Sequence, residues 1–272
     1  MTSKKSVLIA AVLLAVAAAA GVVLITLATR QTPTQPEPIA GKPPIPTRLV
    51  TPAAAQIRAA YKTWPKGTLE KMLLLSRQYQ GDPEVQFTFG VALLWGGYGN
   101  EAGATLERAK KLGRDTQIEV NADSLLHPNY FPGDPPFRPA TADKLLTQGA
   151  LLQAQGKRHS AAAIWSKAAA AEPTNPDAQV AAAIGLWDKD NITPAFSHLG
   201  PLTKKFPQSQ AVRFYIGLLL VWTGQRDPAI AQFKKAVALG PKTDLGTQSQ
   251  AFVTKLSAPA PTTQAGTTTT GS

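Results

Sequence analysis

The chain has 272 residues, a formal net charge of +11 and no cysteine. The lack of cysteine excludes disulfide bonds, thiolate metal ligands, thiol nucleophiles and lipid attachment to a cysteine behind a signal sequence. The basic charge would suit nucleic acid, but the Lys and Arg residues have no interleaved aromatic residues. This distribution favours a solvated basic surface, or one that faces anionic lipid or an acidic partner.

The N-terminal part of the chain has the pattern of a membrane anchor. Residues 1–5 form a short basic head, and residues 6–29 contain no charged side chain. At about 1.5 Å per residue, a helix of this length crosses a hydrocarbon core of roughly 30 Å. We predict a single transmembrane helix or signal anchor, with Lys4 and Lys5 in the cytoplasm and the rest of the chain outside it, where no nucleic acid is expected. The alternative is a cleaved signal peptide and a secreted soluble protein, although residues 27–29 match a cleavage site poorly.

Two segments have compositions that oppose a packed core. Residues 30–52 are rich in Pro and Thr, which predicts an extended linker. Residues 258–272 are rich in Thr, Pro and Gly, which predicts a disordered tail. The intervening residues 53–257 are enough for one sizeable folded domain.

The folded part repeats at an interval of 34 residues. The recurring positions are Pro173, Pro207 and Pro241; Gly149, Ala183 and Gly217; Ala161, Ala195 and Ala229; and Trp165, Leu199 and Phe233. Within each unit the apolar residues recur at helical spacing on both sides of a turn, for example at Gly224. This pattern predicts pairs of antiparallel helices that bury their apolar faces against neighbouring pairs, as in a solenoid.

The order of small and large residues resembles the tetratricopeptide repeat. The last unit has Gly217, Gly224, Ala229, Phe233, Ala236 and Pro241 at the positions that the family pattern requires. The resemblance covers residues 83–116, 142–175, 176–209 and 210–243, although the family's Trp near the start of each unit is replaced by Gln86, Leu145, Gln179 and Arg213. It implies an all-α, right-handed solenoid of antiparallel helix pairs that binds protein or peptide partners.

Three further segments complete the expected domain. Residues 53–61 and 69–79 are expected to form a divergent capping pair of helices, and residues 244–256 a final capping helix. Residues 117–141 interrupt the repeats with five prolines and three aromatic residues. A long structureless loop is unusual inside a compact domain, so we expect these aromatic residues to pack back onto the solenoid, either over its concave face or at the junction between units.

No constellation of residues predicts catalysis, a metal or a cofactor. His127, His159 and His198 fall in different parts of the chain, with no carboxylate expected at ligand spacing. The glycine-rich run 96–99 lacks a preceding strand and a Gly-Lys-Ser/Thr ending, and its place in the repeat is the turn between helices. We therefore expect a protein that is not an enzyme.

The resemblance instead implies a concave groove lined by the first helix of each unit. The expected groove residues are Phe87, Val91, Leu94, Trp95, Leu146, Ala150, Gln153, Val180, Ile184, Trp187, Phe214, Leu218 and Trp222. Such an apolar surface would suit a helix or an extended peptide of a partner, in envelope assembly, secretion or cytochrome c maturation. The alternative is that these side chains form a core covered by the interruption or by a terminal helix.

Overall fold

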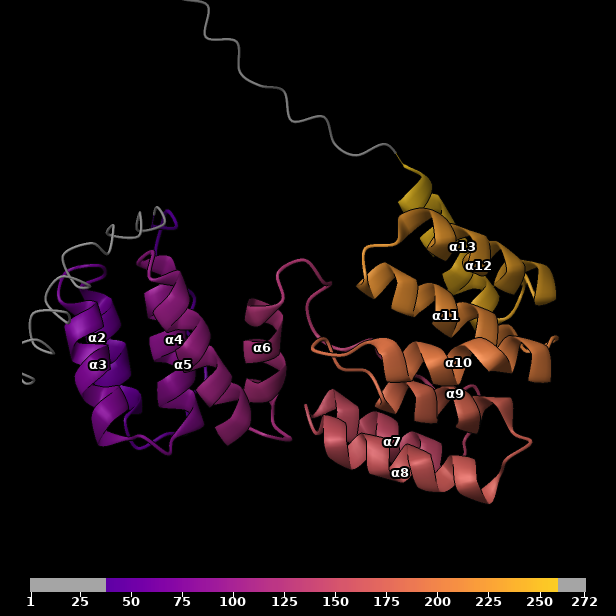
Figure 1. Ribbon diagram of the computed structural model, residues 1–272, viewed down its shortest axis with the longest axis horizontal. Helices are drawn as coiled ribbons and strands as arrows, with labels where there is room; N and C mark the ends of the chain where they lie inside the picture. Colours follow the sequence, from indigo (N-terminus) through magenta and orange to yellow (C-terminus); the bar gives the residue numbers. More distant parts are fainter. Residues whose placement is uncertain (1–37, 259–272) are drawn as a thin grey trace, which may run out of the picture.

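The computed structural model describes residues 38–258, and every regular element in this range is an α-helix (Figure 1). The helices are α2 (Ala54–Lys62), α3 (Thr68–Gln78), α4 (Pro83–Trp95), α5 (Gly99–Leu112), α6 (Gln117–Leu126), α7 (Lys144–Ala154), α8 (Arg158–Ala171), α9 (Pro176–Gly185), α10 (Thr193–Lys205), α11 (Gln210–Trp222), α12 (Arg226–Leu239) and α13 (Asp244–Ser257). The expected basic head, membrane span and tail from residue 259 lie outside the described range.

The predicted pairs of helices are confirmed. The four repeats correspond to α4 with α5, α7 with α8, α9 with α10 and α11 with α12, while α2 with α3 forms the first pair and α13 packs on α12 and α11. The glycine-rich run forms the turn between α4 and α5, as expected. Among residues 38–258, no helix is long and apolar enough to cross a membrane.

The interval of 34 residues also separates the N-caps of α9, α11 and α13. Asn175, Ser209 and Thr243 are the N-caps of α9, α11 and α13, and each side chain accepts a hydrogen bond from a backbone N–H in the first turn. These bonds satisfy donors that have no partner inside the helix. The repeated cap therefore starts successive units in the same register.

In the repeats, a small residue on the first helix packs closely against a large residue on the second helix. A Cβ atom built on Gly149 would lie 2.2 Å from Nε1 of Trp165, and one built on Gly217 would lie 2.9 Å from the Phe233 ring. Trp165 and Phe233 are almost fully buried. The recurring Gly and aromatic positions of the sequence are therefore direct contacts between the two helices of a unit.

Gly149→Ala is expected to destabilise the protein by about 1–3 kcal/mol, because the added methyl group would overlap the Trp165 ring. Gly103→Ala in α5 is the matched control, since a Cβ atom there meets nothing within 4 Å. That control should leave stability unchanged or raise it by up to about 1 kcal/mol, because alanine costs less backbone entropy in a helix. Urea unfolding followed by circular dichroism measures both. Equal effects of the two substitutions would contradict the close contact.

Two glutamines at equivalent repeat positions join successive units. Gln86 Nε2 donates to the Ser76 and Tyr79 carbonyls at the end of α3, and Gln179 Nε2 donates to the Ala169 carbonyl in the last turn of α8. The last carbonyls of a helix have no partner within it. These glutamines stand at the position of the family's Trp, and their side chains bond to free carbonyl groups at the end of the preceding helix.

The second half of the expected linker lies against the first helices. Leu49 is buried in the apolar cluster of α2, α3 and α4, and Ile39 N–H donates to the Trp95 carbonyl over 3.0 Å. Glu84 Oε2 accepts from the N–H groups of Val50 and Thr51, each over 2.8 Å. Residues 39–51 therefore depart from the expected free spacer, because Pro43 and Leu49 are buried and a carboxylate on α4 accepts from the backbone of Val50 and Thr51.

The interruption divides the repeats into two lobes (Figure 1). Its first part is α6, which packs on α5 and α4, and its second part is the extended segment 127–143. The amino-terminal lobe, α2–α6, has its own two apolar clusters, and the carboxy-terminal lobe, α7–α13, has a third. Helix α6 was not expected from the sequence. It ends at Leu126, because Pro128 disfavours helical geometry at the preceding residue, His127.

Candidate functional site

In the carboxy-terminal lobe, the expected groove residues are buried. The side chains concerned are Leu146 on α7, Val180 and Ile184 on α9, Trp187 just after α9, and Phe214, Leu218 and Trp222 on α11. All of them belong to one apolar cluster. Little of their surface is exposed, and Phe214, Leu218 and Trp222 line only a small hollow of about 150 Å³.

The cover over these side chains includes the chain's own segment 131–139. Phe131 N–H donates to the Trp222 carbonyl over 3.0 Å, and Trp222 Nε1 donates to the Gly133 carbonyl over 3.2 Å. Arg138 N–H donates to the Tyr215 hydroxyl, which in turn donates to the Arg138 carbonyl. The segment is thus held through its backbone, in the way that a groove holds an extended peptide.

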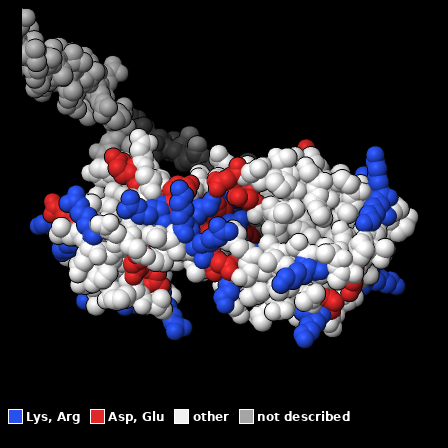
Figure 2. All heavy atoms as spheres, turned by 60° about the horizontal axis from the view of Figure 1, so that its bottom comes forward, with Lys and Arg blue, Asp and Glu red and all other residues white. Residues whose placement is uncertain are grey.

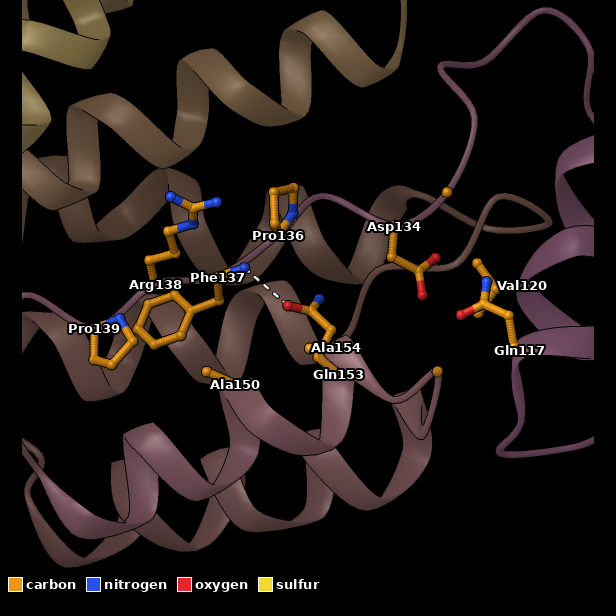
Figure 3. Close-up of a pocket in the computed structure, with 12 residues that line it drawn as sticks. Gln117, Val120, Asp134, Pro136, Phe137, Arg138, Pro139, Ala150, Gln153 and Ala154 are labelled. Carbon is orange, nitrogen blue, oxygen red and sulfur yellow. Dashed lines mark hydrogen bonds between the residues drawn. The ribbon is translucent and has the colours of Figure 1, made fainter.

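Gln153 on α7 makes the most specific of these contacts. Its Oε1 accepts from Phe137 N–H over 2.8 Å (Figure 3), and its Nε2 donates to the Pro135 carbonyl over 3.0 Å. Pro135 and Phe137 are buried, whereas Pro136 and Arg138 between and after them are exposed. The Gln153 side-chain amide therefore bonds to the backbone of an extended stretch in which buried and exposed side chains alternate.

Aromatic rings anchor the same segment. The Phe137 ring lies with its centroid 5.2 Å from the Trp165 ring and 5.2 Å from the Tyr215 ring. The Phe131 ring lies 4.6 Å from the Trp222 ring, yet half of its surface stays exposed. Such tilted and edge-to-face pairs contribute beyond the burial of apolar area. Phe137 is therefore the deep anchor of the segment.

The amino-terminal lobe keeps an open groove. Phe87, Val91 and Trp95 line one wall of a cavity of about 520 Å³, with α6 opposite. Phe87 and Val91 are themselves largely buried, and Trp95 is the partly exposed member of this wall. Leu94 does not line it, because this side chain packs with the cluster of α2 and α3 on another side of α4. We call this cavity the open groove. Its lining residues are Pro44, Ile45, Pro46, Phe87, Val91, Trp95, Gln117, Val120, Asn121, Ser124, Leu125, Pro132 and Gly133.

Two further hollows share lining residues with the open groove. A cavity of about 410 Å³ beside Gln153 and Phe137 shares Gln117, Val120 and Gly133 with it (Figure 3). A cavity of about 450 Å³ next to Arg48 shares Pro46 and Asn121 with it, as well as Gln117. The concave surface is therefore continuous along α6, from the docked segment 39–51 to the docked segment 131–139.

The two lobes meet through charged groups rather than through a shared apolar core. Charged side chains of both signs gather over the middle of the face shown in Figure 2. Asp115, Glu119, Asp123 and His127 recur every four residues, just before, along and at the end of α6. We call these four residues the α6 ionic stripe. Residues four apart in a helix share one face, so the stripe can meet the other lobe as a unit.

The first half of the stripe caps a helix of the other lobe. Asp115 Oδ1 accepts from the N–H groups of His159 and Ser160, over 2.9 and 3.1 Å. Helix α8 has no side-chain cap of its own, so Asp115 satisfies its free donors from across the junction. Glu119 Oε1 lies 2.7 Å from Nε2 of His159.

The second half of the stripe is centred on Asp123, whose side chain is buried. Its carboxylate lies 2.7 Å from Lys110 Nζ, 3.6 Å from an Arg158 nitrogen and 3.8 Å from Lys189 Nζ. Lys110 belongs to α5, whereas Arg158 and Lys189 belong to the carboxy-terminal lobe. One carboxylate thus faces three cations from both lobes.

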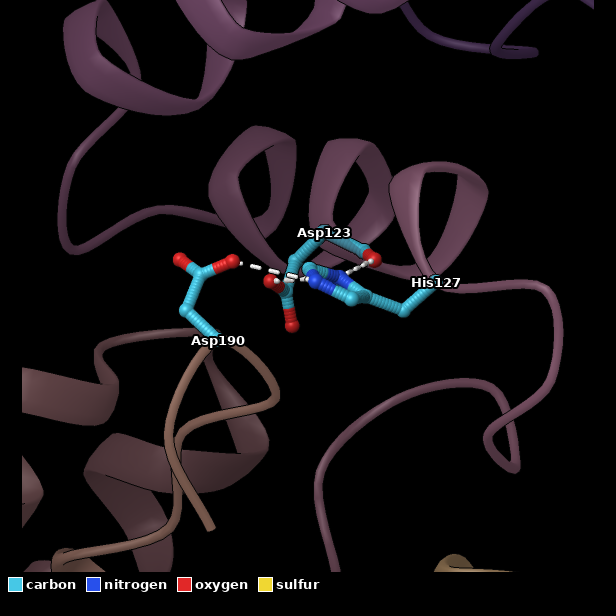
Figure 4. A group of neighbouring side chains, drawn as sticks. All are labelled: Asp123, His127 and Asp190. Atoms are coloured by element: carbon cyan, nitrogen blue, oxygen red, sulfur yellow. Dashed lines mark hydrogen bonds and ion pairs between the residues drawn. The ribbon is translucent and has the colours of Figure 1, made fainter.

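The stripe also corrects the expectation that no carboxylate lies near the histidines. Ligand atoms of Asp123, His127 and Asp190 lie within 4.8 Å of one another, which is close enough for a shared metal ion (Figure 4). However, Lys110 Nζ lies 2.7 Å from Asp123 Oδ1 and 2.6 Å from Asp190 Oδ2. A divalent cation would have to displace this ammonium group, so the residues fit an ion-pair network better than a metal site.

The pKa directions agree with this network. Burial alone would lower the pKa of Lys110, but its hydrogen bonds to Asp123 and Asp190 outweigh burial and raise it. The hydrogen bond from Lys110 lowers the pKa of Asp190 despite partial burial. A raised lysine pKa stabilises the fold below about pH 10, and a lowered aspartate pKa stabilises it above about pH 4. The Lys110–Asp190 pair therefore contributes between these limits and weakens on either side of them.

Burial has the largest effect on the pKa of two other side chains at the junction of the lobes. It raises the pKa of Asp134, although Arg158 opposes the shift, and it lowers the pKa of Lys189, although Asp123 opposes that shift.

The four-residue spacing of the stripe was visible in the sequence. Its partners Arg158, Lys189 and Asp190 could not be assigned, because they lie in another lobe.

Comparisons with known proteins add little beyond the helical architecture. No family model matches the chain, and no curated protein sequence matches it. The structure is similar to MamA 41-end from Desulfovibrio magneticus RS-1, at 17% identity and a TM-score of 0.29, over 70% of this chain and 94% of that one. It is also similar to MamA AMB-1, at 18% identity and a TM-score of 0.29, over 68% and 95% of the two chains. At these values the likeness supports no conclusion about function.

Proposed function

We propose that the chain is a protein-interaction scaffold of the tetratricopeptide type, without catalytic activity, that binds a segment of a partner protein in the open groove. The observation that carries this proposal is the groove itself, an apolar hollow of about 520 Å³ on the concave side of α4 and α6. Large exposed apolar hollows on helical repeats are typical sites for partner segments. The pairing of Gly149 with Trp165 and of Gly217 with Phe233 supports the repeat type.

We further propose that residues 6–29 anchor the scaffold in the cell membrane as an uncleaved single span, with the repeats outside the cytoplasm. The support is the uncharged run and the basic residues before it. The alternative is a secreted soluble protein with a cleaved signal peptide. The mass of the mature N-terminus distinguishes the two, because a cleaved chain begins after the uncharged run.

Crosslinking from the groove tests the binding proposal. A photoreactive residue at Trp95, which lines the open groove, should give a discrete adduct with a partner protein in intact cells. The same residue at Leu74, which is 65% exposed on α3 and lines none of the hollows described above, is the matched control. We expect the adduct at Trp95 and at Asn121, on the opposite wall, and not at Leu74. Equal labelling from all three positions would contradict a specific groove.

A further inference from the structure

The concave surface already binds proline-rich stretches of its own chain at two places. At one end, residues 39–51 lie against α4, where Ile39 N–H donates to the Trp95 carbonyl and Trp64 Nε1 donates to the Gly41 carbonyl over 3.1 Å. At the other end, residues 131–139 lie against α7 and α11, held by Gln153, Tyr215 and Trp222. Both stretches are extended and rich in proline. The open groove lies between them, with Pro44 and Pro46 on one side and Pro132 on the other.

The chemistry that holds segment 131–139 is present again in the open groove. At segment 131–139, the Gln153 side-chain amide bonds to the backbone of Pro135 and Phe137, and aromatic rings pack against the Phe137 ring. In the open groove, Gln117 Nε2 donates to Asn121 Oδ1 over 3.0 Å, and both side chains line the hollow. Within residues 38–258, Gln117 Oε1 and Asn121 Nδ2 have no hydrogen-bond partner, which leaves one acceptor and one donor for a ligand. Trp95 and Phe87 supply the aromatic wall.

We propose that the occupant of the open groove is an extended, proline-rich segment of the partner protein, read by Gln117 and Asn121 and packed against Trp95. This inference rests on the proposed function and names the kind of partner. Prolines suit such a groove because they favour the extended conformation before binding and donate no N–H that the apolar wall would leave unpaired. Grooves lined by aromatic residues recognise proline-rich segments in this way. The middle turns of an amphipathic helix would present no free backbone groups to Gln117 and Asn121, because those groups are paired within the helix.

The test uses the full chain and three labelled peptides in fluorescence anisotropy titrations. The first probe has the sequence of residues 129–141, the second replaces each of its prolines with alanine, and the third is an amphipathic helical peptide of equal length. We expect the first probe to bind at least tenfold more tightly than either of the others. Equal affinity for the alanine peptide, or tighter binding of the helical peptide, would overturn the inference.

Substitutions show where on the protein the first probe binds. Trp95→Ala, and separately Gln117→Ala with Asn121→Ala, should each weaken the first probe at least fivefold, and Leu74→Ala should not. Gln117 is exposed and Asn121 is half-buried, so this pair tests the groove even if Trp95→Ala lowers stability. Tyr215→Phe removes a hydroxyl that holds segment 131–139 and should leave the affinity unchanged. If instead only Tyr215→Phe weakens binding, the probe has entered the groove of the carboxy-terminal lobe, and the inference is wrong.

The two proposals fail in different ways. One outcome is that crosslinking from Trp95 captures a partner that the helical peptide displaces and the proline-rich peptide does not. That result would support the scaffold proposal and contradict the proposal of a proline-rich occupant. If no adduct forms at Trp95 and no peptide binds, both fall.

Discussion

Asp123→Ala is expected to lower the free energy of unfolding by about 3–5 kcal/mol, because it removes the one carboxylate that faces three cations at the junction of the lobes. The Asp123 side chain is 1% exposed and that of Lys189 is 0% exposed, so water cannot replace the lost charge. Lys110, Arg158 and Lys189 would then repel one another in a desolvated site. Urea unfolding of the full chain measures the loss.

Asp190→Ala is the matched control for this prediction. The Asp190 side chain is 52% exposed and also pairs with Lys110. An exposed ion pair contributes at most about 1 kcal/mol, so this variant should change stability little. A double variant, Asp123→Leu with Lys189→Leu, should recover part of the stability, since apolar residues can replace a buried ion pair. An equal and small loss for Asp123→Ala and Asp190→Ala would show that the network does not hold the lobes together.

Phe137→Ala is expected to cost about 3–5 kcal/mol, because this ring is buried between Trp165 and Tyr215 and anchors segment 131–139. The apolar contacts within α7–α13 remain, so helical content should persist. The amides of Phe131, Phe137 and Arg138, each hydrogen-bonded to the lobe beneath, should lose protection from hydrogen exchange.

Phe131→Ala is the comparison for Phe137→Ala. The Phe131 ring packs on Trp222, but it is 51% exposed, so its removal should cost much less. If Phe137→Ala leaves the three amides protected, the segment is held by its backbone contacts alone and the ring is not its anchor.

Local patterns were enough to predict most of the helices. The recurrence of small and large residues at an interval of 34 predicted the pairs α7 with α8, α9 with α10 and α11 with α12, and the final helix α13 was predicted as a cap after the last unit. Such patterns survive in the sequence because each pair must place a small residue such as Gly217 against a large one such as Phe233. The first pair, α2 with α3, followed from apolar periodicity and the break at residues 64–67.

The outcome for the candidate site was mixed for a physical reason. Phe87, Val91 and Trp95 line the open groove, but their binding role stays a prediction. The equivalent residues of the carboxy-terminal lobe are buried, partly beneath segment 131–139. The position of a residue within the repeat predicts whether its side chain lies on the concave face of the solenoid. It carries no information about what lies on that face, because the covering segment has no periodic pattern and is held in part through its backbone N–H and C=O groups.

The sequence by itself determined the all-α architecture, the phase of the helix pairs and the chemistry available to the molecule, since these depend on the spacing of apolar side chains and on the lack of cysteine. Only the tertiary structure decided that the interruption forms α6 and a cover, and that the repeats separate into two lobes joined by Asp123. Both decisions depend on contacts between residues far apart in the chain. Arg138 with Tyr215 and Lys110 with Asp190 are such pairs, and no local pattern specifies them.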